Sequence, residues 1–97
     1  MLILVTYDVN TTTPSGQSRL RKVAKYCESY GQRVQYSVFE CLLDASQYVR
    51  FKSDILSLID MSSDSIRFYN LGNKFKTKVE VIGVKKVLFD QANIIVI

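Results

Sequence analysis

The sequence predicts an α+β domain in which short strands alternate with two amphipathic helices and pack with them as two layers. Three observations lead to this fold class. Several segments are rich in β-branched and aromatic residues, two others repeat apolar residues at helical spacing, and no glycine-rich phosphate-binding loop interrupts them. With 97 residues, of which 47% are hydrophobic, the chain has the size and composition of a single domain, residues 1–97, with one core.

The first predicted strand covers residues 3–7, where aliphatic, β-branched or aromatic side chains occupy both faces of the pleat. This pattern is typical of a central strand that is covered on each side. The strand runs onto a carboxylate, Asp8, and the polar stretch NTTTPSGQS follows as a loop. The same stretch offers Ser15 and Ser18 as N-caps for the next helix.

The first helix is predicted over residues 19–30, because apolar residues recur there every three or four positions. These residues are Leu20, Val23, Ala24, Cys27 and Tyr30. Gly31 follows them and is expected to end the helix.

The next segment, RVQYSVFECLL, returns to strand, but its alternation changes phase. One face carries Val34, Tyr36 and Val38, and the other carries Phe39, Cys41 and Leu43. A strand with both faces buried, a β-bulge, or two short strands that meet near Tyr36 and Ser37 would each explain the change.

A second helix is predicted from a capping box, in which Asp44 is the N-cap and Gln47 the residue three positions later. The buried stripe of this helix is expected to consist of Tyr48, Phe51, Ile55, Leu58 and Ile59.

Three later segments are predicted as strands. SIRFYNLG is one, and GNK forms a plausible turn into KVEVIG. The third, NIIVI, is so apolar that it needs another strand to pair with.

This succession of elements in under a hundred residues predicts a ferredoxin-like two-layer sandwich, with both helices on one face of the sheet. The other face then has no cover within the chain, although its strands are apolar enough to need one. We therefore expect a homodimer. Residues 1–83 would form the core of the domain, and residues 84–97 a tail whose final strand pairs with the partner.

Composition narrows the chemistry further. The formal net charge of +4 and the pI near 9.2 permit a polyanionic partner. The sequence has no histidine, so any catalysis must use carboxylates, hydroxyls, thiols or cations.

Cys27 and Cys41 do not form a CxxC motif and are expected to be reduced thiols in the core. The apolar first residues have neither the length of a membrane span nor a basic region before them, so we expect a cytoplasmic protein.

Asp8 is the main candidate for chemistry. In a monomer it would be a capping or loop-bonding carboxylate. In a dimer whose first strands pack near the twofold axis, two Asp8 side chains would face each other and repel unless a cation lies between them. Mg²⁺ suits such a site, with Mn²⁺ as an alternative, because it binds one or two carboxylates and keeps several waters. A cation held in this way can activate water for attack on a phosphodiester.

A basic face on the first helix is the second candidate site. Its cations lie at helical spacings and are opposed only by Glu28 in that segment. They are Arg19, Arg21, Lys22 and Lys25, with Arg33 shortly beyond the helix. The alternative interpretation is a solvated face, although such faces usually mix charges of both signs.

A second basic run could serve to guard an edge strand instead. It comprises Lys74, Lys76, Lys78, Lys85 and Lys86. The aromatic residues are expected in the core rather than on a base-stacking platform; they include Tyr26, Tyr36, Phe39, Phe68 and Tyr69.

Three stretches together resemble the small CRISPR-associated nuclease family, the smaller of the two core proteins of spacer acquisition. They are YD at the end of the first strand, RLRKVAKYCESYGQRVQYSVFEC, and SIRFYNLG, and the resemblance covers roughly residues 2–83. It implies a ferredoxin-like homodimer whose final strand crosses to the partner, and Mg²⁺-dependent cleavage of DNA or RNA in some members. It also implies a scaffold role, in which the dimer bridges two dimers of a larger CRISPR-associated integrase and supports double-stranded DNA.

Residue by residue, the resemblance makes Asp8 the catalytic metal ligand, with Tyr7 as its structural neighbour. It matches Arg19, Arg21 and Arg33 to basic positions near the active cleft. Ser37 and Phe39 fall in the supporting SVFE stretch, and Lys22 joins the nucleic-acid-binding set by its place on the helix.

Three functions follow from these observations. The first is a Mg²⁺-dependent endonuclease that acts on DNA, with single-stranded RNA as the other substrate. The second is a DNA-binding adaptor without chemistry of its own. The third is a ferredoxin-like regulatory or RNA-binding module.

Overall fold

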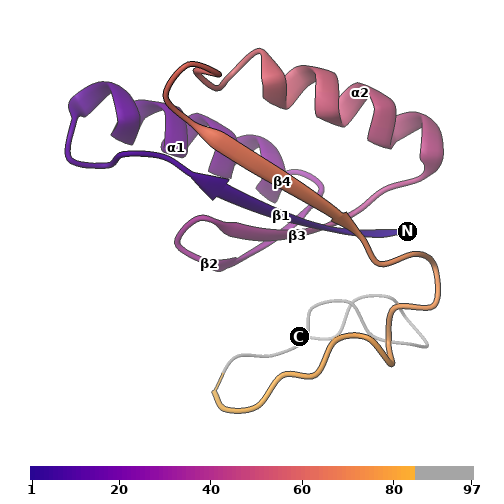
Figure 1. Ribbon diagram of the computed structural model, residues 1–97. Coiled ribbons are helices and arrows are strands. Elements are labelled where there is room, and N and C mark those ends of the chain that lie inside the picture. The colour runs from indigo at the N-terminus through magenta and orange to yellow at the C-terminus, as the bar shows by residue number, and fades with distance from the viewer. Residues whose placement is uncertain (85–97) are drawn as a thin grey trace.

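The computed structural model describes residues 1–84, which fold as a four-stranded antiparallel sheet with two helices (Figure 1). In chain order the elements are β1 (Leu2–Asp8), α1 (Pro14–Glu28), β2 (Gly31–Gln35), β3 (Val38–Leu42), α2 (Ala45–Leu56) and β4 (Ser65–Asn70). The strand order across the sheet is β2-β3-β1-β4, which makes β3 and β1 the two inner strands. This βαββαβ arrangement confirms the predicted α+β fold.

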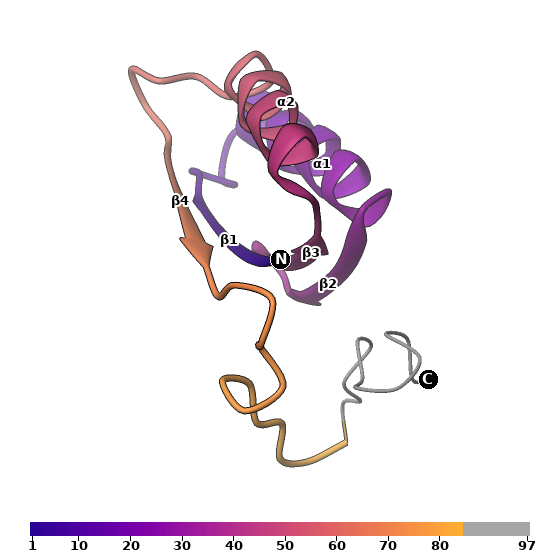
Figure 2. The ribbon, with the colours of Figure 1, turned by 90° about the vertical axis from the view of Figure 1, so that its right-hand side faces the viewer.

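Both helices cover the same face of the sheet (Figure 2). The core lies between the two layers, where every second residue of β1 points at the helices because side chains alternate along a strand. Its buried members are Ile3, Val5, Tyr7, Leu20, Val23, Ala24, Cys27, Phe39, Cys41, Leu43, Phe51 and Ile55. Both cysteines are free and buried, as predicted.

Helix α1 begins earlier than predicted. Its N-cap is Thr13, whose hydroxyl accepts a hydrogen bond from the Gly16 N–H at 3.1 Å, and Pro14 occupies the first turn. Ser15 and Ser18 therefore lie inside the helix, and their prediction as caps was wrong. A proline fits this position because it has no N–H to leave unpaired.

The prediction that Gly31 ends α1 was also wrong. The helix ends at Glu28, and Gly31 is the first residue of β2. A Cβ at Gly31 would lie 1.9 Å from the Glu40 carbonyl oxygen on β3, so glycine is required by the close approach of two strands.

The change of phase in residues 33–43 comes from two short strands. A turn at Tyr36 and Ser37 separates β2 from β3, which selects the third of the sequence alternatives. The β2–β3 pairing also shifts its register between Arg33 and Gln35. Helix α2 begins with the predicted capping box, in which the Asp44 carboxylate accepts from the Gln47 N–H at 2.7 Å.

The outer face of the sheet has no second layer among the described residues (Figure 2). Leu4, Val38 and Leu42 are half-buried on it, beside polar side chains. Within residues 1–84 no helix is long and apolar enough to cross a membrane.

The chain leaves the sheet after β4. Gly72, at a positive φ of 77°, turns it away, and residues 78–83 form no strand in the described part of the chain, so that prediction was wrong. A strand needs a partner for its backbone groups, and no described strand lies beside this segment. Ile82 is 87% exposed there. The NIIVI strand, its pairing with a partner, and Lys85 and Lys86 lie outside the described residues.

Candidate active site

Asp8 is the last residue of β1 and is exposed on the outer face of the sheet. Tyr7 points into the core, so the alternation of the strand turns Asp8 the opposite way. Within residues 1–84 its carboxylate has no hydrogen bond or ion pair. The described structure therefore gives no support to a capping or loop-bonding role.

Asp8 lies in a shallow depression of about 370 Å³ at the end of β1. Its lining residues are Thr6, Tyr7, Asp8, Ser37, Ser65, Arg67 and Tyr69. Tyr7 was expected beside Asp8, and Ser37 was expected among the supporting residues. The lining residues from β4, which are Ser65, Arg67 and Tyr69, were not expected there. Their position depends on the pairing of Asp8 with Ser65 across the sheet.

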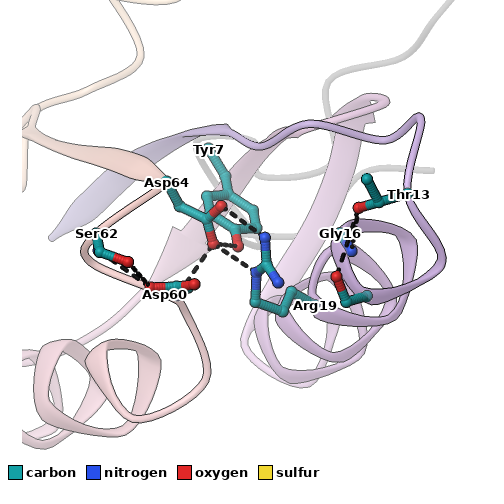
Figure 3. A network of polar contacts seen from close by, with 8 residues as sticks. Tyr7, Thr13, Gly16, Arg19, Asp60, Ser62 and Asp64 are labelled. Carbon is teal, nitrogen blue, oxygen red and sulfur yellow. Dashed lines mark hydrogen bonds and ion pairs between the residues drawn. The ribbon is translucent and has the colours of Figure 1, made fainter.

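A buried carboxylate, Asp64, holds this end of the sheet together from the helix side (Figure 3). Arg19 donates two hydrogen bonds to it, from Nε at 2.8 Å and from Nη2 at 3.0 Å. The Tyr7 hydroxyl donates a third at 2.5 Å, and the Asp60 N–H a fourth at 3.0 Å. The contacts join β1, α1 and the turn that precedes β4.

These contacts determine the ionisation of the group. Burial opposes the charged form of Asp64, but the hydrogen bonds from Arg19, Tyr7 and the Asp60 N–H outweigh it and lower the pKa to about 2. Burial and the neighbouring carboxylate raise the pKa of the Tyr7 hydroxyl. At neutral pH the network is therefore an ion pair with a neutral tyrosine.

Arg19 differs from the other predicted nucleic-acid-binding residues. Its side chain is 20% exposed, and its guanidinium group is paired with Asp64, whose side chain is 0% exposed. Arg21 and Lys22 are exposed, and neither forms an ion pair within the described residues. A role for Arg19 in binding nucleic acid stays a prediction, and the structure shows it engaged in an intramolecular contact.

A second hollow, of about 610 Å³, runs between α1 and the β2–β3 turn and is called the basic groove below. It is lined by Gln17, Leu20, Arg21, Ala24, Lys25, Glu28, Arg33 and Tyr36. The Arg33 guanidinium lies 5.0 Å from the centre of the Tyr36 ring, and its Nε donates to the Tyr36 carbonyl at 2.8 Å.

The exposed aromatic rings correct the sequence interpretation. Tyr36 is 68% exposed and Tyr69 is 41% exposed, so neither occupies the core. Phe39 is fully buried as expected, and the centre of its ring lies 5.8 Å from the Arg33 guanidinium. Tyr36 lines the basic groove and its neighbour Ser37 lines the Asp8 depression, so this turn borders both hollows.

The fit of a metal ion to Asp8 can be judged from the side chains present. Within residues 1–84, no three His, Cys, Asp or Glu side chains lie close enough together to hold a metal ion. One chain therefore offers a single carboxylate in this depression, together with the hydroxyls of Ser37 and Ser65. Oxygen ligands of this kind suit Mg²⁺, which keeps much of its water shell and accepts only one or two carboxylates.

Fold and site together define a class: a small ferredoxin-like domain in which a carboxylate at the end of an inner strand has no partner within residues 1–84. The family model described as CRISPR associated protein Cas2 matches residues 1–79. The chain belongs to this family, which confirms the resemblance found in the sequence.

Individual relatives support the same assignment. The CRISPR-associated endonuclease Cas2 of Halalkalibacterium halodurans is 59% identical over 85 residues, which cover 88% of each chain. The CRISPR-associated endoribonuclease Cas2 of Chlorobaculum tepidum is 55% identical over 86 residues, or 89% of this chain and 90% of that protein. The crystal structure of Streptococcus pyogenes Cas2 at pH 6.5 is 54% identical, with a TM-score of 0.78 over 86% of this chain and 100% of that one.

Proposed function

We propose that this protein is a metal-dependent endonuclease in which two copies each contribute Asp8 to one Mg²⁺ site. The observation that carries the proposal is the exposed Asp8 carboxylate: within residues 1–84 it has no partner, and no described element covers the sheet face on which it lies. The names of the relatives, which include both endonuclease and endoribonuclease, support phosphodiester cleavage.

The uncovered sheet face supports the dimer. Leu4, Val38 and Leu42 are half-buried there, and a second copy packed on them would remove their apolar surface from water. Asp8 lies at the end of the same face, so twofold packing with the first strands near the axis would bring two carboxylates into one site. A Mg²⁺ ion there would supply charge stabilisation and activation of water. Mn²⁺ is the expected substitute.

Asp8→Asn tests the proposal, because it removes the charge and preserves the shape of the side chain. We expect cleavage of duplex DNA and of single-stranded RNA to fall at least about 100-fold, and EDTA to abolish the parental activity. Asp44→Asn is the matched control, since it makes the same chemical change at the exposed N-cap of α2, where asparagine also caps a helix. Parental cleavage by purified Asp8→Asn protein would disprove the mechanism.

The basic groove favours a second function, a nucleic-acid-binding adaptor that bridges dimers of a CRISPR-associated integrase on double-stranded DNA. Arg21, Lys25 and Arg33 line this groove with a single opposing carboxylate, Glu28. Contacts of this kind neutralise phosphates and make affinity strongly dependent on salt.

The adaptor proposal is tested with the double variant Arg21→Ala/Lys25→Ala, because Arg19 is already engaged with Asp64. We expect weaker DNA binding and a shallower dependence of affinity on salt. Arg50→Ala is the control, since Arg50 lies on α2 with its side chain 83% exposed. An unchanged salt slope in the double variant would exclude the groove from phosphate contact.

A further inference from the structure

Arg67 is the cation of the Asp8 depression, and no function has been assigned to it above. In the β1–β4 ladder Asp8 pairs with Ser65, and Thr6 pairs with Arg67. Residues that pair across a sheet share a face, so Arg67 lies on the same outer face as Asp8. As a diagonal neighbour it is about 7–8 Å from Asp8 between Cα atoms, within reach of a long side chain.

The guanidinium of Arg67 is held but not neutralised. Its Nη1 donates a hydrogen bond to the Tyr69 hydroxyl at 3.3 Å. Neither ion pair recorded within residues 1–84 includes Arg67: Arg19 pairs with Asp64, and Arg50 with Asp54. Arg19 is therefore occupied by Asp64 on the helix side of the sheet, whereas Arg67 lies in the Asp8 depression on the outer side.

Charge balance shows why the site needs such a residue. Two Asp8 carboxylates carry two negative charges, and one divalent cation between them brings the sum to zero. A neutral metal site has little long-range attraction for a phosphodiester, and the pair of carboxylates repels it at short range. Two Arg67 side chains, one from each protomer, would restore a net positive charge at the place where the phosphate must lie.

We propose that Arg67 binds the phosphate of the nucleic acid that is cleaved at Asp8, through two parallel hydrogen bonds from its guanidinium. A planar fork matches two oxygens of a phosphate, and Tyr69 orients it. This inference rests on the proposed endonuclease function and adds to it the residue that places the substrate. It differs from the basic groove, whose cations come from α1 and β2.

A different role for Arg67 is an ion pair with the partner's Asp8 across the dimer interface. The two roles differ in a measurable way. An interface ion pair would change the association of the protomers when Arg67 is replaced, whereas a substrate contact would change binding and cleavage and leave association intact.

The experiment compares Arg67→Ala, Arg67→Lys and the control Arg50→Ala in the full chain. Affinity for labelled single-stranded RNA and for labelled duplex DNA is measured in EDTA, where nothing is cut, at several salt concentrations. Cleavage is measured in Mg²⁺ as kcat and KM, and association by sedimentation velocity.

For Arg67→Ala we expect kcat/KM to fall at least about 100-fold. The slope of log affinity against log salt concentration should become shallower by about one per protomer. The sedimentation coefficient should equal that of the parent. Lysine supplies a point charge without the fork, so Arg67→Lys should recover the salt slope but only part of kcat/KM. Arg50→Ala should match the parent in every assay.

Three results would overturn the inference: parental affinity and kcat/KM in Arg67→Ala, parental kcat/KM in Arg67→Lys, or a loss of association in Arg67→Ala. Failure of the proposed function would look different. In that case Asp8→Asn would still cleave as fast as the parent. The affinities measured in EDTA would then show by themselves whether Arg67 contacts phosphate.

Discussion

Replacement of Asp64 by Asn should destabilise the protein strongly, although the side chain keeps its size. The carboxylate is 0% exposed and receives four hydrogen bonds, two of them from Arg19. Asn keeps one acceptor oxygen, removes the negative charge, and brings an N–H₂ group to face donors. Breaking one partner of a buried ion pair costs about 3–5 kcal/mol. Because the Arg19 side chain is 20% exposed and regains some solvation, we expect the lower limit, about 3 kcal/mol.

The assay is urea unfolding followed by circular dichroism at one protein concentration, since association would otherwise change the apparent stability. A loss of about 3 kcal/mol corresponds to a decrease in Tm of roughly 12–24 °C for a domain of this size. Arg50→Ala is the control. Its exposed pair with Asp54, at 4.0 Å, should contribute less than about 0.5 kcal/mol.

The pH dependence gives an independent test of the same contact. The pKa of Asp64 is about 2 in the folded protein and about 3.9 in an unfolded chain, so the ion pair stabilises fully above the higher value. Its contribution is lost as the pH falls towards 2. The difference in stability between the parent and Asp64→Asn should therefore shrink between about pH 4 and pH 2. A difference below 1 kcal/mol at pH 7, or one that does not change with acid, would refute this reasoning.

Three further substitutions test other parts of the structure. Asp8→Asn should leave the free energy of unfolding within about 0.5 kcal/mol of the parent, measured in urea, because the carboxylate is exposed and has no partner in residues 1–84. Gly31→Ala should lower the free energy of unfolding by more than about 2 kcal/mol in the same assay, because the new Cβ would lie 1.9 Å from the Glu40 carbonyl oxygen. An unchanged stability would mean that β2 can shift away from β3 without cost. Asp44→Ala should cost about 1 kcal/mol, since it removes the N-cap bond to Gln47, and Asp44→Asn should recover most of it if capping is the cause.

Local patterns in the sequence were sufficient for the elements whose signals lie within a few residues. The capping box at Asp44 and Gln47 depends on a spacing of three residues and was found where predicted. The cap of α1 was misplaced because Thr13, Ser15 and Ser18 have similar side chains, and the choice depends on how Pro14 starts the first turn. The phase change near Tyr36 left three alternatives because only the cross-strand pairing distinguishes a bulge from a turn.

The candidate site was only partly accessible from the sequence. Asp8 was found because a carboxylate at the end of an apolar strand is unusual. Asp64 was missed because its partners Tyr7 and Arg19 are 57 and 45 residues away, and no periodicity links such distant positions. Arg67 was missed for the same reason, since its closeness to Asp8 follows from the β1–β4 register.

The alternation of side chains at Tyr7 and Asp8 has a consequence for how this protein can change over evolutionary time. Tyr7 belongs to the folding core, and its immediate neighbour Asp8 lies in the exposed depression on the opposite side of the same backbone. Under the proposed function, a single substitution at Asp8 would therefore remove the chemistry while the architecture persists. Descendants that lost Asp8 in this way would still fold, and selection could then act on their role in assembly alone.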